Sequence, residues 1–215
     1  MKCILFIVFF MAGFLSVSAQ TYNEWIDKSF ECIESEDWTG AEKALIGALR
    51  VQPANPQNAL LLSNLGTIQR KMGKNDEALK SYTNALMITP RSVTLLMNRA
   101  ALFSEMEKFD DALKDYNQVL MLDDKEEDAL YLRGLIRLEK NDTTACRKDF
   151  EQLLKINPKS SNARIGLAAL MKLRGYYTEA IDLYTQVIRV NPEQTSLYLN
   201  RGEAYLLNRR LNKAD

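Results

Sequence analysis

The chain has 215 residues, of which 47% are hydrophobic and 26% are charged, fractions typical of folded globular proteins that exclude a disordered chain as the default. Lysine and arginine together number 28, as do aspartate and glutamate. This balance argues against nucleic-acid binding, which requires a basic excess.

Residues 1–19 have the pattern of a secretory signal peptide. Lys2 is an early cation, an apolar run extends from Ile4 to Phe14, and short side chains precede an expected cleavage site after Ala19. An uncleaved membrane anchor is the alternative, but roughly 12 to 16 apolar residues fall short of the ~20 needed to span a bilayer. We therefore expect export to the periplasm or the extracellular medium, without stable membrane insertion after cleavage.

From residue 22 onward the sequence repeats itself with a period of 34 residues. A small residue recurs at this step, with three inserted residues, 56–58, between the first two occurrences, and a large apolar residue follows four positions later. The small residues are Ala41, Ala78, Ala112, Cys146, Ala180 and Ala214, and the large ones are Leu45, Tyr82, Tyr116, Phe150 and Tyr184. Such self-similarity predicts a stacked array of helical repeats.

The first half of each repeat predicts a helix of its own. With position 1 at Tyr22, positions 4, 7, 8 and 11 of each repeat lie on one helical face, and position 8 is mostly small. Each repeat is therefore predicted to be an antiparallel helix pair. Each second helix should stop at a proline or, in the third repeat, at an aspartate; these residues are Pro53, Pro90, Asp124, Pro158 and Pro192. The predicted boundaries are 22–55, 59–92, 93–126, 127–160, 161–194 and a partial repeat at 195–215.

This pattern resembles the tetratricopeptide repeat (TPR) family over residues 22–215. The second repeat shows the family pattern best, through Leu62, Leu65, Gly66, Ala78, Tyr82, Ala85 and Pro90. The resemblance implies an all-α, right-handed α-solenoid of stacked antiparallel helix pairs, a TPR superhelix with five full repeats and a partial sixth. It also implies a non-catalytic scaffold for protein–protein interaction.

The residues themselves offer little catalytic chemistry. Histidine is absent, which removes Ser–His and Cys–His nucleophiles and most zinc sites. The acidic run 123–128 lacks the alternating ligands and central glycine of a calcium loop, so it is interpreted as a linker with acids at a helix N-terminus. We predict no catalytic, cofactor-binding or metal-binding residues. Asn141 to Thr144 matches glycosylation acceptor patterns in a predicted turn, and the sequence leaves modification open.

The resemblance also implies where a partner would bind. In the family the concave groove is lined by positions 2, 5, 6, 9, 12 and 13 of the first helix, and we expect it to be basic and polar at its N-terminal end and apolar in the middle. The candidate partner-binding residues are Asn64, Arg70, Lys71, Met97, Asn98, Tyr131, Leu135, Ile165 and Asn200. An extended peptide or a partner helix would suit such a groove. Alternatively, curvature buries Leu132 and Leu135 against neighbouring helices.

Some family members clamp the C-terminal carboxylate of chaperones with lysine and asparagine at positions 5 and 9. Here those positions hold Ile26 and Phe30 in the first repeat, and Ser63 and Thr67 in the second. We therefore expect no chaperone binding of this kind.

Two other functions stay open. The chain could be the N-terminal input domain of a longer exported enzyme or regulator, because it stops at Asp215, early in a second helix. A carbohydrate-binding or hydrolytic role is weaker, since paired carboxylates are needed and the groove offers only the separated Asp128 and Glu203.

Overall fold

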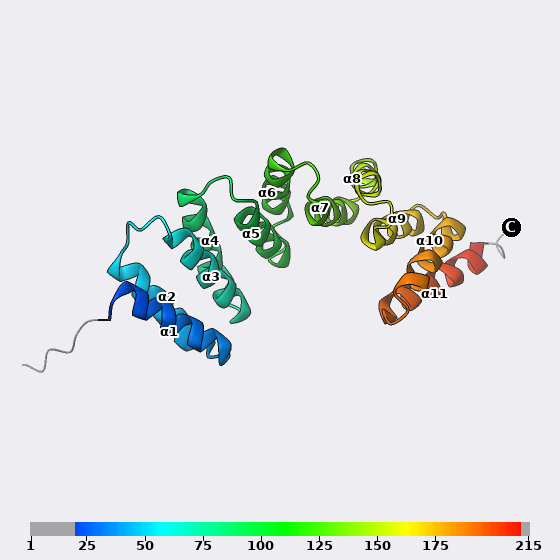
Figure 1. The fold of residues 1–215 in the computed structure, drawn as a ribbon. Helices are drawn as coiled ribbons and strands as arrows, with labels where there is room; N and C mark the ends of the chain where they lie inside the picture. Colours follow the sequence, from blue (N-terminus) through cyan, green and yellow to red (C-terminus); the bar gives the residue numbers. More distant parts are fainter. Residues whose placement is uncertain (1–19, 212–215) are drawn as a thin grey trace, which may run out of the picture. The chain divides into compact units, whose positions relative to one another are not determined.

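The computed structural model describes residues 20–211, and all regular secondary structure in that range is α-helical (Figure 1). The predicted signal peptide, residues 1–19, lies outside the described residues, as do residues 212–215. The chain divides into two compact units, Met1–Pro53 and Ala54–Asp215.

The described part of the first unit is one helix pair, α1 (Tyr22–Glu34) and α2 (Trp38–Val51). The side chain of Thr21 accepts from the backbone N–H of Glu24, and the Glu24 carboxylate accepts from the N–H of Thr21, which completes a capping box at the start of α1. Asp37 caps α2 through the N–H of Gly40 at 2.9 Å. The pair packs through small and apolar side chains, namely Tyr22, Ala41, Ala44, Leu45 and Ala48.

The second unit continues with helix pairs that pack on one another in chain order (Figure 1). Its helices are α3 (Asn58–Lys71), α4 (Asn75–Ile88), α5 (Val93–Glu105), α6 (Phe109–Leu122), α7 (Glu127–Glu139), α8 (Thr143–Ile156), α9 (Ser161–Leu173), α10 (Tyr177–Val190) and α11 (Thr195–Leu211). Each even-numbered helix packs against the odd-numbered helix before it and the one after it. The predicted all-α fold of stacked antiparallel helix pairs is confirmed.

A residue in the left-handed conformation ends the first helix of each of five pairs. These residues are Glu36, Gly73, Glu107, Asn141 and Gly175, with φ between 57° and 81°. Gly73 and Gly175 are thus turn glycines, as the sequence predicts, because this conformation costs glycine little. Arg209 occupies the equivalent position in α11 but stays helical, so α11 has 17 residues where the other first helices have 13 or 14.

The buried face of these first helices is wider than the predicted stripe. Positions 3 and 10, which the sequence pattern did not single out, are also buried, because an interior first helix packs against its own second helix and against the preceding one. The position-3 residues are Leu61, Leu95, Ala129, Ala163 and Leu197, and the position-10 residues are Ile68, Leu102, Ile136, Leu170 and Ala204.

Position 8 is small because an aromatic ring of the second helix covers it. A Cβ on Gly66 would lie 2.8 Å from Cε1 of Tyr82. A Cβ on Gly134 would overlap the ring of Phe150, which also lies against Gly166 of the next repeat. The close packing of each pair therefore depends on a ring fitting over a position without a side chain.

Candidate functional site

The second unit has a cavity of about 680 Å³ along its first helices. Side chains at positions 9, 12 and 13 of three such helices line it, which are the outer positions of the predicted groove. The lining residues are Leu135, Leu138 and Glu139 of α7, Ala169, Lys172 and Leu173 of α9, and Leu207 of α11.

The cavity surface is mainly aliphatic. Leu135 and Leu138 pack on the buried cluster around Phe150, so their inner edges are fixed by the core. Leu173 is 54% exposed. An apolar side chain entering here would exchange water for contact with leucine, a change that favours binding by about 25 cal/mol per Å² of apolar surface buried.

The charges at the cavity are partly neutralised within the protein. The Nζ of Lys172 lies 2.7 Å from Oε2 of Glu203. Glu139 is exposed and forms no ion pair with any residue in the range 20–211. The cavity is therefore apolar with an acidic edge.

Two tyrosines belong to the same part of the unit. Burial raises the pKa of Tyr184 to about 12, and the nearby carboxylate of Glu203 adds to this shift. Burial also raises the pKa of Tyr131, whose ring centroid lies 6.3 Å from that of Phe150. Both hydroxyls therefore stay protonated near neutral pH.

The predicted basic N-terminal end of the groove is not found at Arg70. Its Nε donates to Oε2 of Glu105 at 2.7 Å and a second nitrogen pairs with the other carboxylate oxygen. Hydrogen bonding to Glu105 raises the pKa of Arg70. The sequence pattern missed this pairing because it joins position 12 of one repeat to position 13 of the next.

The other sequence candidates lie along the same helices but only Leu135 lines the cavity. Met97 packs against the core cluster around Tyr116, and so does Leu132, which supports the alternative of burial for Leu132. Ile165 packs against the cluster around Tyr184. Asn64, Asn98 and Asn200 are half-buried and Lys71 is exposed. The cavity residues that the prediction did not commit to are Leu138, Glu139, Ala169, Lys172, Leu173 and Leu207.

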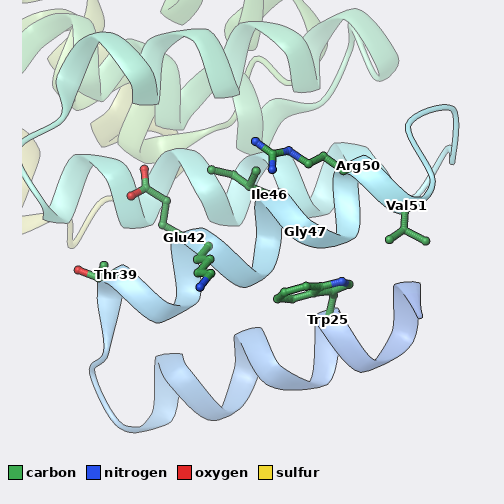
Figure 2. A pocket seen from close by; sticks show the side chains of 8 residues that line it. Trp25, Thr39, Glu42, Ile46, Gly47, Arg50 and Val51 are labelled. Carbon is green, nitrogen blue, oxygen red and sulfur yellow. The ribbon is translucent and has the colours of Figure 1, made fainter. Parts of the chain in front are cut away.

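The first unit has a pocket of its own, of about 470 Å³. Figure 2 shows the indole of Trp25 lying between α1 and α2, beside Gly47. A Cβ on Gly47 would lie 2.6 Å from the indole, so glycine is required for the ring to pack here. The other lining residues, all on α2, are Thr39, Glu42, Lys43, Ile46, Arg50 and Val51. Both charge signs surround this pocket, and no sequence pattern had indicated it.

Within residues 20–211, no three acidic or cysteine side chains gather closely enough to hold a metal ion. None of the helices in this range is long and apolar enough to cross a membrane. The acidic run 123–128 joins α6 to α7, where Glu127 and Asp128 occupy the first turn of α7. This position agrees with its interpretation as a linker.

Known proteins share both the sequence pattern and the fold. Models of the tetratricopeptide repeat match residues 61–94, 128–160 and 168–214. A tetratricopeptide repeat protein from Parabacteroides merdae is 40% identical over 90% of this chain and 75% of its own, with a TM-score of 0.84. No curated protein sequence matches the chain.

Two further structures are more distant. The first TPR of Spaghetti (RPAP3), bound to the HSP90 peptide SRMEEVD, is 29% identical over 55% of this chain and 94% of its own, with a TM-score of 0.52. MamA from Desulfovibrio magneticus is 16% identical over 80% of this chain and 96% of its own, with a TM-score of 0.72, and shares the fold. On the strength of the repeat matches and the Parabacteroides relative, this chain belongs to the tetratricopeptide repeat family.

Proposed function

We propose that the chain is a non-catalytic protein-interaction scaffold that receives apolar side chains of a peptide or partner helix in the cavity between α7, α9 and α11. The observation that carries this proposal is the aliphatic lining formed by leucines of three successive first helices. Proteins of this repeat family serve as interaction scaffolds. The proposal assigns that role to one place on this chain.

The charges favour one class of partner. Breaking the pair between Lys172 and Glu203 to bind a ligand would cost free energy, whereas Glu139 has no partner to lose. A peptide with two or three large apolar residues and a neighbouring lysine or arginine therefore matches the cavity. An acidic C-terminal tail such as that of the HSP90 peptide would meet the carboxylate of Glu139 instead. We accordingly propose that the chain does not act as a carboxylate clamp.

The proposed partner is encountered outside the cytoplasm, because residues 1–19 carry the signal-peptide pattern. Sequencing the N-terminus of the protein recovered from the cells that express it tests this step. Export with cleavage predicts a mature chain that begins at Gln20. A chain that retains Met1 and remains in the cytoplasm would contradict it.

Selection of a phage-displayed random peptide library on the mature chain tests the proposed cavity. We expect enriched peptides to carry apolar residues next to a basic one and to lose affinity for Leu173→Lys. Leu173 is a suitable position because its exposed side chain can be replaced without opening the core. Met87→Lys, on α4 and also highly exposed, is the matched control and should leave binding unchanged.

A second pair of changes separates binding from folding. Tyr131→Asp with Ile165→Lys is expected to abolish capture of the selected peptides. Because both side chains pack partly against core clusters, helicity must be measured alongside binding. Loss of helicity in this pair, with full binding by Leu173→Lys, would refute the proposed cavity.

A further inference from the structure

One face of α11 differs from the equivalent face of every complete repeat. Tyr198, Gly202 and Tyr205 lie at i, i+4 and i+7, so they share one stripe of the helix. Tyr198 is 42% exposed and Tyr205 is 54% exposed. We name this stripe, together with Arg201, the α11 face. Leu207 and Glu203, which belong to the cavity proposed above, lie on a different side of the helix.

The first sign that the α11 face is incomplete is the space above its glycine. In the second and fourth repeats, the ring of Tyr82 or Phe150 occupies the space where a Cβ would be placed on Gly66 or Gly134. A Cβ on Gly202 would have no heavy atom within 4 Å. The same position therefore presents an aromatic-sized recess.

The second sign is the arginine at position 7. Arg99 binds both carboxylate oxygens of Asp115, at 2.7 and 2.8 Å, and its third nitrogen donates to Thr83 of the preceding repeat at 3.3 Å. Arg133 repeats the arrangement with Asp149 and with Asn117. Each arginine thus joins two second helices to one first helix.

Arg201 makes only half of these contacts. Its Nη1 donates to Oγ1 of Thr185, in the preceding repeat, at 3.1 Å, and its guanidinium lies 5.5 Å from the ring centroid of Tyr198. Within residues 20–211, no carboxylate pairs with it. A guanidinium that retains its inter-repeat hydrogen bond but lacks the bidentate carboxylate is prepared to accept one.

In the interior repeats a single helix supplies both missing groups. Asp115 directly precedes Tyr116, and Asp149 directly precedes Phe150, with a fully buried small residue four positions before each ring. We propose that the α11 face binds a partner protein's amphipathic helix that carries this pattern: a small residue, two variable residues, an aspartate and then an aromatic residue. Its aspartate pairs with Arg201, and its ring fills the recess over Gly202.

A second copy of the chain is a poor source of this helix. Its Asp–aromatic steps are three: Asp115 and Asp149 already bind arginine, while Asp37 caps α2 ahead of Trp38. A copy could offer one only by unfolding a repeat. The occupant is therefore a helix of another protein, and this face is independent of the cavity lined by Leu173.

The test uses a fluorescent, hydrocarbon-stapled peptide with the sequence of residues 143–156 and alanine in place of Cys146. Fluorescence anisotropy should show saturable binding to the full chain. Peptides with Asp149→Asn or Phe150→Ala should each bind roughly tenfold more weakly, as expected for central anchor residues. Leu173→Lys should bind the stapled peptide normally, so failure of this proposal and failure of the proposed cavity are distinguishable.

Two protein variants locate the binding. Gly202→Leu fills the recess and should weaken binding by roughly tenfold or more, and it should fold because the space is open. Ser196→Leu adds the same side chain to another side of α11 and should have no effect. Binding that Gly202→Leu leaves intact would overturn the proposal, since the peptide would then be replacing α8 or binding elsewhere. No saturable binding would also overturn it, as would a concentration-dependent dimer in sedimentation equilibrium that Gly202→Leu abolishes.

Discussion

The interior pair α7–α8 and the terminal helix α11 have the same residues at the same repeat positions but different surroundings. Gly134 and Gly202 both occupy position 8, and Arg133 and Arg201 both occupy position 7. A ring covers Gly134 whereas Gly202 is open, and two oxygens of a carboxylate hold Arg133 whereas Arg201 has none. A residue's contribution here is thus decided by its neighbouring helix.

This difference follows from the architecture. A stack of repeats is stabilised by interfaces between nearest neighbours, so an end repeat keeps its local sequence but loses one interface. The comparison of α7–α8 with α11 therefore isolates the interface from the local sequence, and substitutions at matched positions measure its contribution.

The largest expected effect is at the carboxylate that joins two arginines. Asp149 is 2% exposed at its side chain and binds both Arg133 and Arg137. Asp149→Ala would leave two guanidiniums partly buried without a counter-charge, which we expect to cost about 3–5 kcal/mol. Arg201→Gln at the end of the stack removes one hydrogen bond and should cost no more than about 1 kcal/mol. Urea unfolding of both variants measures the difference.

Equal losses in the two variants would show that the interior ion pairs add nothing beyond a surface contact. Asp182→Ala is the matched control, because Asp182 is also an aspartate of a second helix but is exposed. Its unfolding midpoint should stay close to that of the parent.

The next effect is at position 8. Gly134→Leu would place a side chain into the ring of Phe150, and overpacking of this kind costs on the order of 1–3 kcal/mol or more. Gly202→Leu meets no atom and replaces a helical glycine, so it should be neutral or stabilise by up to about 1 kcal/mol. Thermal melts of the two variants should therefore shift in opposite directions or differ clearly in size. A Gly134→Leu protein that melts like the parent would remove Gly134 from the contact between α7 and α8.

Sequence periodicity predicted the fold because each repeat is a local unit. Helices α5, α7, α9 and α11 begin at Val93, Glu127, Ser161 and Thr195, the residues counted as position 1. The helix before each of four prolines ends two residues earlier, because proline cannot continue the helix. These features depend on spacing along the chain, which the sequence displays directly.

The site was harder to predict because it depends on contacts between repeats. Arg70 was expected to make the groove basic, but Glu105 of the next repeat neutralises it. Position 7 was expected to be part of the core stripe, yet Arg133 occupies it because Asp149 lies opposite. Leu173 and Leu207 meet at one cavity only when successive first helices lie side by side. No period within one repeat contains that information.

A smaller effect concerns local opening at the end of the stack. α11 packs against α10 and exposes its outer stripe, whereas α3 packs against its partner α4 along its length. Backbone amides of residues 199–207 should therefore exchange with solvent at least ~10-fold faster than those of residues 62–69 in the monomeric chain. Equal protection in the two segments would show that the α11 face needs no covering helix for stability. Addition of the stapled peptide should slow exchange in residues 199–207 alone.

The smallest expected effect is the alkaline titration of Tyr184. Burial raises its pKa to about 12, whereas an unfolded tyrosine titrates near about 10. Because the folded pKa is the higher one, the contribution of this residue to stability is complete below pH ~10 and is lost as the pH rises through about 12. The urea midpoint of the parent should therefore fall over this interval, and that of Tyr184→Phe should fall less. Tyr205→Phe, at the exposed end of the stack, is the matched control and should follow the parent. Parallel curves for all three proteins would mean that the interface between α10 and α11 does not shield Tyr184 from solvent, and the contrast between interior and end would then not extend to this last pair of helices.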